Sequence, residues 1–510
     1  MPTDEKEFST LRSIFWPIHR HELRRFVPMG VMMFFILFNF SVLRDSKDAL
    51  VMTAKGAGAE VLPLLKVGGV IPFAFLTFFI YLKLSNIVRR QTLFYLSILP
   101  FVLFFIIFDL YLFPNRELLH LDTLADFLER LLPKNSGLIP AVSFIRNWTF
   151  SLYYIVAELW GSVVISLLFW GFANDVTTTS EAKRFYVLFP MISNFALIMS
   201  SFSVIYYAKQ SDALGQALDS LIFWVVASAL VIIALYWWMN KSLFKERLKH
   251  QGLSHEPGKA DGKKEKLKLS LRESLKLILT SRYLGSIAFI VVAYGLCIHV
   301  VEVLWKAQMQ LMFPKQTDYL KAQGYYTLAI GLINFPMMLV GTNVIRRMGW
   351  KKAAYATPLI LGTTGAVFFG LLIFQGDLEI LASNWKISVL SILVTTGAIQ
   401  GILSKSTKYT LFDATKEMAL IPLDQEEKVK GKAAIDVVAS RFGKFGGGVL
   451  VLGMLSIWTL QSIPIYAGIL VLSIIGIWFL SLNFIDKRFS VLTEKLKKEE
   501  ENLERLEEHI

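Results

Sequence analysis

The feature that most constrains this chain is a series of apolar runs, each about 18 residues long or longer. A helix of that length spans the hydrocarbon core of a bilayer. Because 54% of the 510 residues are hydrophobic, we predict an all-α polytopic membrane protein with about twelve transmembrane helices rather than a large soluble core. The predicted spans form two sets of six, at about 26–43, 61–82, 91–113, 146–170, 185–208 and 217–239, then 282–305, 325–345, 352–374, 386–403, 433–457 and 463–484.

A strongly basic segment separates the two sets of spans. Residues 241–282 hold 12 Lys and Arg against 5 Asp and Glu. The formal charge of +13 could suggest a nucleic-acid partner, but its concentration between two apolar halves is typical of a cytoplasmic loop, so we expect no nucleic acid. The predicted organisation is an N-terminal six-helix bundle (1–240), a basic cytoplasmic linker (241–281), a C-terminal six-helix bundle (282–485) and a charged cytoplasmic tail (486–510).

The shorter loops favour one orientation in the membrane. Basic residues follow spans two, four and eight on the side of the central linker, whereas 114–145 carries four acidic residues against three basic ones. The positive-inside rule therefore predicts that both termini are cytoplasmic. We see neither a cleavable signal nor an Arg- and Ser-rich transit peptide, which weighs against a plastid precursor.

The two halves also repeat loosely. A basic loop recurs after the second span of each half, and the charged entry to span five corresponds to the charged entry to span eleven. Two six-helix halves around a central cavity describe a major-facilitator-like 6+6 architecture, in which the solute binds near the midplane and the halves rock around it.

Charged residues inside the spans are the main functional candidates, because each costs roughly 2.5–3.5 kcal/mol at the centre of a bilayer. Arg44 and Lys47 end span one and could together face an anion, with Asp45 and Asp48 holding them or pairing with the other half. The alternative is a set of local salt bridges at the membrane interface.

Span four carries a polar stripe at helical spacing, which suits a cavity wall. Arg146 precedes it and could be a phosphate contact or an interfacial anchor. The serines could equally serve in helix packing. The stripe consists of Asn147, Ser151, Tyr154, Glu158 and Ser162.

Spans seven and eleven carry further charges. Glu302 and Lys306 lie four residues apart and could neutralise each other, or the carboxylate could lose its partner during a transport cycle. His299, on the same face, is expected to be a satisfied helix histidine. In span eleven, Arg441 and Lys444 share a face, and the neighbouring glycines would allow a helix or ligand to come close.

Other classes of function lack their motifs. There is no G-x-x-x-x-G-K-[ST] phosphate loop, which disfavours an ATP-driven pump. A single cysteine, seven scattered histidines and no HExxH provide neither a metal site nor a nucleophile–base pair, so we expect no enzyme, no metal and no cofactor. A passive channel would not accelerate uptake when unlabelled solute is placed on the far side.

The run KYTLFDATKEMALIPLDQEEKVKGKAAIDVVASRFGKFGG resembles the signature of the ATP/ADP translocases, the nucleotide transporters of obligate intracellular bacteria and plastids. Segments such as FNFSVLRDSKDALV (38–51), KGAGAEVLPLLK (55–66), AELWGSV (157–163) and EAKRFYVLF (181–189) resemble the same family, and the resemblance covers Leu11 to about Ile485.

This resemblance implies a carrier that exchanges external ATP for internal ADP, as in energy parasitism, by alternating access. It marks Lys47, Glu158, Glu302 and Lys444 as the functional charged positions. Lysines would neutralise phosphates, and the glutamates would hold those lysines when the site is empty. We predict that the substrate site also includes Arg44, Arg146, Arg441, Tyr154 and Asn147.

The alternative is a proton-coupled net importer of one or several nucleoside triphosphates, since family members differ in this respect. Ser404 and several lysines after it are expected at the inner mouth, with Lys405 or Lys408 as the one direct contact. The partners predicted are ATP and ADP as transported substrates and the lipid bilayer, and we expect a monomer. Whether phosphate accompanies ADP is left open by the sequence.

Overall fold

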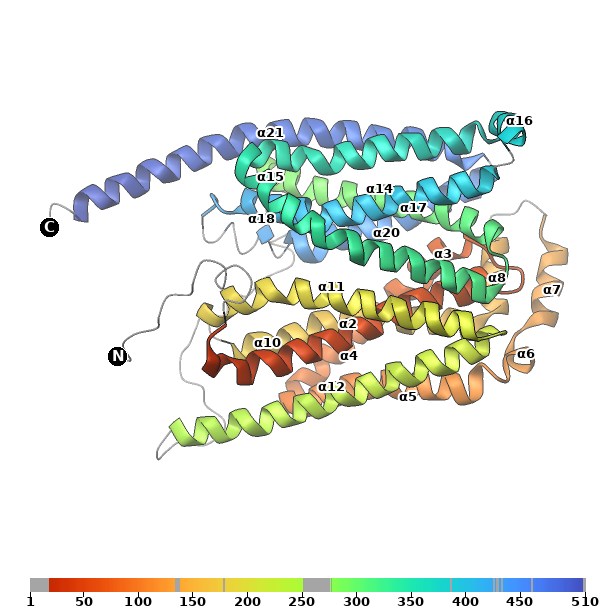
Figure 1. Cartoon of the computed structure of the whole chain (residues 1–510), viewed down its shortest axis with the longest axis horizontal. Helices are drawn as coiled ribbons and strands as arrows, with labels where there is room; N and C mark the ends of the chain where they lie inside the picture. Colours follow the sequence, from red (N-terminus) through yellow and green to blue (C-terminus); the bar gives the residue numbers. More distant parts are fainter. Residues whose placement is uncertain are drawn as a thin grey trace.

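The computed structural model describes residues 18–133, 138–177, 179–250, 276, 278–385, 388–424, 427, 431–432, 434–459 and 462–507. Every regular element in these residues is a helix, and the long helices run beside one another along one axis (Figure 1). Ten of the helical segments are long and apolar enough to cross a membrane. Helices also occupy the two other predicted spans, so the prediction of an all-helical membrane protein is confirmed.

The helices before residue 250 pack together. They are α2 (Leu23–Met52), the continuous path α3 (Val61–Leu64), η2 (Leu65–Val70) and α4 (Ile71–Ile87), then α5 (Arg90–Ile107) with η3 (Phe108–Leu112), the path α9 (Trp148–Trp160), η4 (Gly161–Phe169) and α10 (Trp170–Val176), and finally α11 (Thr179–Gln210) and α12 (Leu214–His250). A short helix, η1 (Arg20–Glu22), precedes α2, and α6 (Arg116–Leu119), α7 (Asp122–Leu131) and α8 (Ile139–Arg146) connect η3 to α9.

The helices after residue 281 form the other side of the molecule (Figure 1). They are α14 (Arg282–Met312), α15 (Gln316–Ile373), α16 (Gln375–Trp385), the path α17 (Val389–Thr407), η5 (Lys408–Phe412) and α18 (Asp413–Leu420), then η6 (Ile435–Ala439), α20 (Ser440–Ile457) and α21 (Ile463–Glu507). The long α15 contains two predicted spans and turns at Gly349, whose φ of 77° is a conformation that favours glycine.

Two ends of the molecule can be distinguished in Figure 1. We call the end with η1 and the last turns of α21 the proximal end, and the end with α6 and α7 the distal end. Most of the predicted linker, 241–281, lies outside the described residues, although α12 extends into it as far as His250.

The outer surfaces of the helices are apolar, as a bilayer requires. On α4, Phe75 and Phe79 are 55% and 62% exposed, which would be unfavourable in water. The interior combines large apolar side chains such as Trp160 with buried charged groups such as Lys47, Asp48 and Lys306. Buried charges in a membrane protein are expensive unless they are paired, so they point to the functional site.

Candidate functional site

Six alternating charges form a continuous series of contacts from one side of the molecule to the other. We call this series the charge chain; its members, in order of contact, are Glu158, Lys47, Asp48, Lys306, Glu302 and Lys405. The first three come from α9 and α2, and the last three from α14 and α17. Residues that lie far apart in the sequence are thus joined at the boundary between the two sets of helices.

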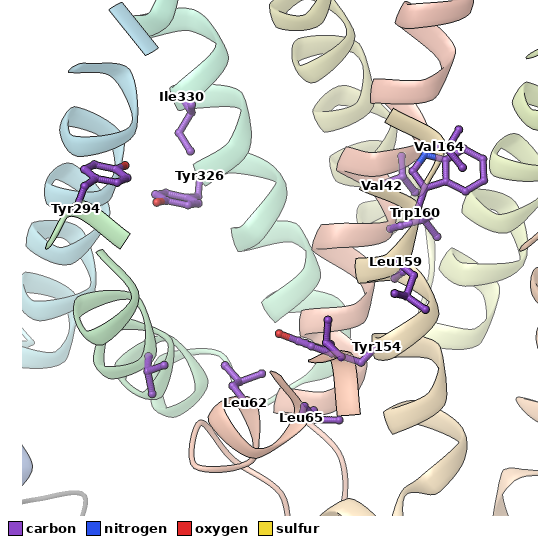
Figure 2. Close-up of a cluster of buried hydrophobic side chains, with 14 of the residues drawn as sticks. Val42, Leu62, Leu65, Tyr154, Leu159, Trp160, Val164, Tyr294, Tyr326 and Ile330 are labelled. Atoms are coloured by element: carbon purple, nitrogen blue, oxygen red, sulfur yellow. The ribbon is translucent and has the colours of Figure 1, made fainter. Parts of the chain in front are cut away.

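Lys47 lies at the N-terminal part of the charge chain and has three partners. Its Nζ lies 2.9 Å from Asp48 Oδ1 and 3.0 Å from Glu158 Oε1. The same atom lies 3.8 Å from the centre of the Tyr154 ring, a cation–π contact. Figure 2 shows Tyr154 extending from α9 on the side of the helix opposite Trp160. The structure therefore brings three predicted site residues, Lys47, Tyr154 and Glu158, together.

Asp48 connects the two sets of helices. Its Oδ2 lies 2.7 Å from Lys306 Nζ on α14, while its Oδ1 accepts from Lys47 on its own helix. All three side chains are at most 5% exposed. A buried carboxylate shared by two ammonium groups is well compensated, and removing it would leave two buried cations facing each other.

Glu302 has a similar position on the C-terminal side. Its Oε1 lies 3.5 Å from Lys306 Nζ and 3.4 Å from Lys405 Nζ, so one carboxylate contacts two lysines. Lys405 also lies 5.1 Å from the centre of the Tyr326 ring. Lys408, the other predicted contact at this mouth, instead pairs with Asp413 at 2.8 Å.

Arg44 and Asp45 make a second connection beside the charge chain. Arg44 Nη2 donates to Thr327 Oγ1 on α15 at 3.1 Å, and Thr327 Oγ1 donates to Asp45 Oδ1 at 3.1 Å. Arg44 Nε also lies 3.4 Å from Asp45 Oδ1. Asp45 and Asp48, near the end of α2, thus both contact the other set of helices. This is one of the two alternatives that the sequence left open for these carboxylates.

The most solvent-exposed side chains of the charge chain lie toward its two ends. Glu158 is 31% exposed, Glu302 is 24% and Lys405 is 19%, whereas Lys47, Asp48 and Lys306 between them are at most 5% exposed. An incoming anion would therefore meet Lys405 and the two glutamates first. Because each glutamate holds a lysine, an anion that replaces a glutamate gains a preformed cationic partner.

Two predicted site residues have other partners. Arg146 is 3% exposed and lies within 3.3 Å of three carboxylates of α7, at the distal end, which favours the anchoring alternative; these are Asp122, Asp126 and Glu129. Asn147 Nδ2 donates to the carbonyls of Lys55 and Ser143, where α8 gives way to α9. The polar stripe therefore serves two purposes. Asn147 and Ser151 donate hydrogen bonds to backbone carbonyls, whereas Tyr154 and Glu158 contact Lys47.

The predicted residues of span eleven lie on α20. Arg441 is exposed, and the structure gives it no contact with the charge chain. For Lys444 the backbone is part of α20, but the side chain lies outside the described part of the chain, so its predicted role stays a prediction. The glycines do allow close approach: a Cβ at Gly447 would lie 2.8 Å from the side chain of His299 on α14.

The sequence interpretation missed Lys66. Its Nζ lies 3.0 Å from His299 Nδ1, across the boundary between the two sets of helices. Lys66 is a single charge between the apolar runs LPLL and VGGV, and that signal alone could have identified it. His299 was expected to be satisfied, but its buried Nε2 has no hydrogen-bond partner in the part of the chain that the structure describes. Among the described residues no group of three or more His, Cys, Asp or Glu could hold a metal ion.

Comparison with protein families adds an independent finding. Residues 1–489 match the family model described as TLC ATP/ADP transporter. The chain is 47% identical to ADP,ATP carrier protein 1 of Chlamydia trachomatis over 89% of its own length and 86% of that protein. It is 41% identical to the chloroplastic ADP,ATP carrier protein 1 of Arabidopsis thaliana, over 94% of its own length and 76% of that protein.

Solved structures of transporters share the fold at low sequence identity. A bacterial homologue of the iron transporter ferroportin, in an inward-facing state, has a TM-score of 0.55 and 13% identity over 91% of this chain and 98% of that one. A D-xylose–proton symporter has a TM-score of 0.53 and 11% identity over 91% and 97%. These similarities support the major-facilitator-like architecture and say nothing about the substrate.

Proposed function

The chain belongs to the TLC ATP/ADP transporter family, and we therefore propose that it exchanges ATP for ADP across a membrane by alternating access. The observation that carries the proposal is the charge chain, because it joins lysines from both sets of helices at buried positions. Fixed cations are what a polyphosphate requires. The reaction is translocation of the intact nucleotide, without hydrolysis.

The proposed mechanism uses the partners that the lysines already have. In the empty carrier Glu158 holds Lys47, and Glu302 holds Lys405. The phosphates of the nucleotide replace the glutamates, and Arg44 and Lys444 complete the cationic surface. Phosphates that compete with Asp48 for Lys47 and Lys306 weaken the ion pair that crosses the boundary, so that the loaded carrier can change its conformation.

The proposed orientation places the proximal end in the cytoplasm of a bacterium, with both termini inside and the distal end outside the inner membrane. The basic loops favour this orientation. The carrier is proposed to work as a monomer in the bilayer. The ion pairs between Arg146 and the carboxylates of α7, at the distal end, would then face the external medium.

Uptake by vesicles that contain the purified chain tests the function. We expect labelled ATP to enter vesicles preloaded with ADP much faster than empty ones. Uptake into empty vesicles that is driven by external acid would instead support the proton-coupled importer. No uptake under either condition would refute both.

The same assay tests the proposed site. Lys47→Gln should lower uptake at least about tenfold, since a charge-assisted hydrogen bond is lost. Lys321→Gln is the matched control, because Lys321 pairs locally with Asp318 on the surface of α15. Normal transport by the Lys47 variant would remove that residue from the site.

A further inference from the structure

A cavity lies at the proximal end of the first set of helices, apart from the charge chain. It encloses about 420 Å³, which falls within the roughly 300–1,000 Å³ of typical small-molecule sites. Its walls come from the end of α4, the start of α5, the path of η4 and α10, and α12, whose positions can be followed in Figure 1. No residue of the charge chain lines it, so the cavity is separate from the site described above.

The lining of the cavity is charged at one end and aromatic at the other. Arg90 is the first residue of α5, Asp175 lies in the last turn of α10, and Arg90 Nη1 forms an ion pair with Asp175 Oδ2. One turn further along α5, Phe94 stacks on Tyr236 with the ring centres 3.7 Å apart, and Phe172 packs edge-on against the same tyrosine. A ligand in the cavity would therefore meet a guanidinium group and apolar rings together.

A glycine keeps part of this space open. Gly171 of α10 lines the cavity, and a Cβ added at this position would have no neighbouring heavy atom within 4 Å. The space beside α10 is thus not filled by any other part of the chain that the structure describes. A larger side chain at Gly171 would fill it without changing the charge of the site.

The cavity lies at the level where the helices leave the bilayer. Directly after Tyr236 on α12, Trp237 and Trp238 are exposed, and Lys241 Nζ lies 4.8 Å from the centre of the Trp237 ring. Exposed tryptophans beside a basic residue are typical of the boundary between hydrocarbon and headgroups. Lipid headgroups would therefore surround the charged end of the cavity, and acyl chains would pass its aromatic end.

Positive charge is in excess around the charged end. Residues 83–90 contain Lys83, Arg89 and Arg90 and no acidic residue, so Asp175 can neutralise only one of the three cations. A guanidinium group has five N–H donors, and the contact with Asp175 engages Nη1, so Arg90 has further donors for a second anion. This balance favours a ligand with a net negative charge.

We propose that this cavity binds an anionic glycerophospholipid from the leaflet at the proximal end. Its phosphodiester contacts Arg90, and its glycerol and first acyl carbons contact the rings of Phe94, Phe172 and Tyr236. Basic pockets between transmembrane helices bind the headgroups of anionic lipids in other membrane proteins. The aromatic end favours a lipid over a free anion, because a free anion would leave these rings without a partner. The proposal concerns lipid binding and does not depend on the transported substrate.

Native mass spectrometry of the purified, delipidated chain tests the proposal by measuring which added lipid it retains. Dioleoylphosphatidylglycerol and dioleoylphosphatidylcholine have the same acyl chains and a phosphodiester each, and only the first has a net negative charge. We expect the wild type to bind one phosphatidylglycerol about tenfold more tightly than phosphatidylcholine. Arg90→Gln should lose most of this preference, because a charge-assisted hydrogen bond is worth about a factor of ten or more.

Two matched variants separate binding from other effects of the charge change. Asp175→Asn breaks the same ion pair as Arg90→Gln but keeps the cation, so it should retain or increase the affinity for phosphatidylglycerol. Lys83→Gln removes an exposed charge from α4, two residues from both Tyr81 and Ser85 and hence on a different face of the helix from these lining residues. This variant should keep the preference for the anionic lipid.

A second variant pair tests the space itself. Gly171→Leu fills the cavity and should weaken the binding of phosphatidylglycerol about as much as Arg90→Gln does. Gly476→Leu is its control, because Gly476 is exposed on α21 and an added Cβ there also has no heavy atom within 4 Å. This pair keeps the proposal testable if Arg90→Gln does not fold.

Several outcomes overturn the inference and leave the proposed function standing. Equal affinity of the wild type for the two lipids would show that the cavity does not select an anionic headgroup. Equal losses in Arg90→Gln and Asp175→Asn would show that their ion pair is only structural. An equal loss in Lys83→Gln would show a diffuse attraction to the basic segment, and unchanged binding in Gly171→Leu would place the lipid outside the cavity.

Discussion

Asp48 is the residue on which the contacts of the charge chain converge. It accepts from Lys47 on its own helix and from Lys306 on α14, and all three side chains are nearly inaccessible. The sequence alone places two carboxylates at the end of a span, next to two cations. Which partner each carboxylate has could not be predicted, because a salt bridge within the helix and one between helices are equally compatible with the spacing.

We expect Asp48→Asn to lower both stability and transport strongly, although asparagine has almost the same size and shape as aspartate. Two buried ammonium groups would lose the charge between them, and breaking a buried pair in this way costs about 3–5 kcal/mol. The apparent unfolding temperature of the purified variant in detergent should fall by several degrees, and nucleotide exchange should be strongly reduced.

Asp413→Asn is the control for this variant, since Asp413 pairs with Lys408 and is 39% exposed. Surface pairs contribute little, so the control should unfold close to the wild-type temperature. An Asp48 variant that is as stable as the control would show that the two lysines do not depend on this carboxylate.

Among the elements, the spans were the most predictable and their internal irregularities the least. Apolar length identified the helices, including the two that α15 joins at Gly349. The π-helical segments η2 and η4 were not foreseen, because hydropathy reports only length and composition. The same limit explains why Lys66 was overlooked and why Asn147 and Arg146 were assigned to the cavity, although the break between α8 and α9 directs them elsewhere.

At the distal end, Arg146 forms ion pairs with carboxylates of α7, and these contacts are separate from the charge chain. A hydrogen bond from Lys55 and then the charges of Lys55 and Arg146 lower the pKa of Asp122, although desolvation acts in the opposite direction. A carboxyl group whose pKa is lower in the folded state stabilises the fold above its unfolded pKa, and this contribution disappears as the pH falls through the folded pKa.

Arg146→Gln should therefore leave the KM for ATP within about twofold of the wild type and reduce stability. Because the variant loses one of the charges that lower the pKa of Asp122, it should start less stable at pH 7 and lose less stability than the wild type during acidification below about pH 5. Thermal unfolding between pH 7 and pH 3 measures this. A large increase in KM with unchanged stability would restore Arg146 to the substrate site.

At the scale of the whole molecule, the hydrogen bonds between the two sets of helices, among the described residues, lie at the middle and the distal end. Gln310 donates to the carbonyl of Ala57 at 3.2 Å, and Gln316 donates to that of Thr53 at 3.4 Å. Near the middle, Asn194 on α11 donates to the carbonyl of Gly331 on α15. From these contacts we infer a state that is closed at the distal end.

Distances between spin labels test whether this state exchanges with another. The single cysteine, Cys297, is buried and can be replaced by serine. Labels at Leu118→Cys and Leu311→Cys, which are 86% and 66% exposed, report the distal end. Labels at Ile87→Cys and Met348→Cys, 70% and 51% exposed, report the proximal end.

We expect Asp48→Asn to lengthen the distal distance and shorten the proximal one, because it removes the ion pair that crosses the boundary. Addition of ATP should broaden both distributions in the wild type. Distances that stay the same in the variant and with ATP would argue against rocking of the two halves.

The composition of the charge chain has an electrical consequence. Three carboxylates and three ammonium groups cancel, and Arg44 cancels Asp45 in the same way. Among the described side chains of this cluster, Lys66 alone is left uncompensated, so these side chains together carry one net positive charge on which the voltage across the bilayer acts. The electric current that accompanies exchange would then measure the difference in charge between the two transported nucleotides, ATP and ADP.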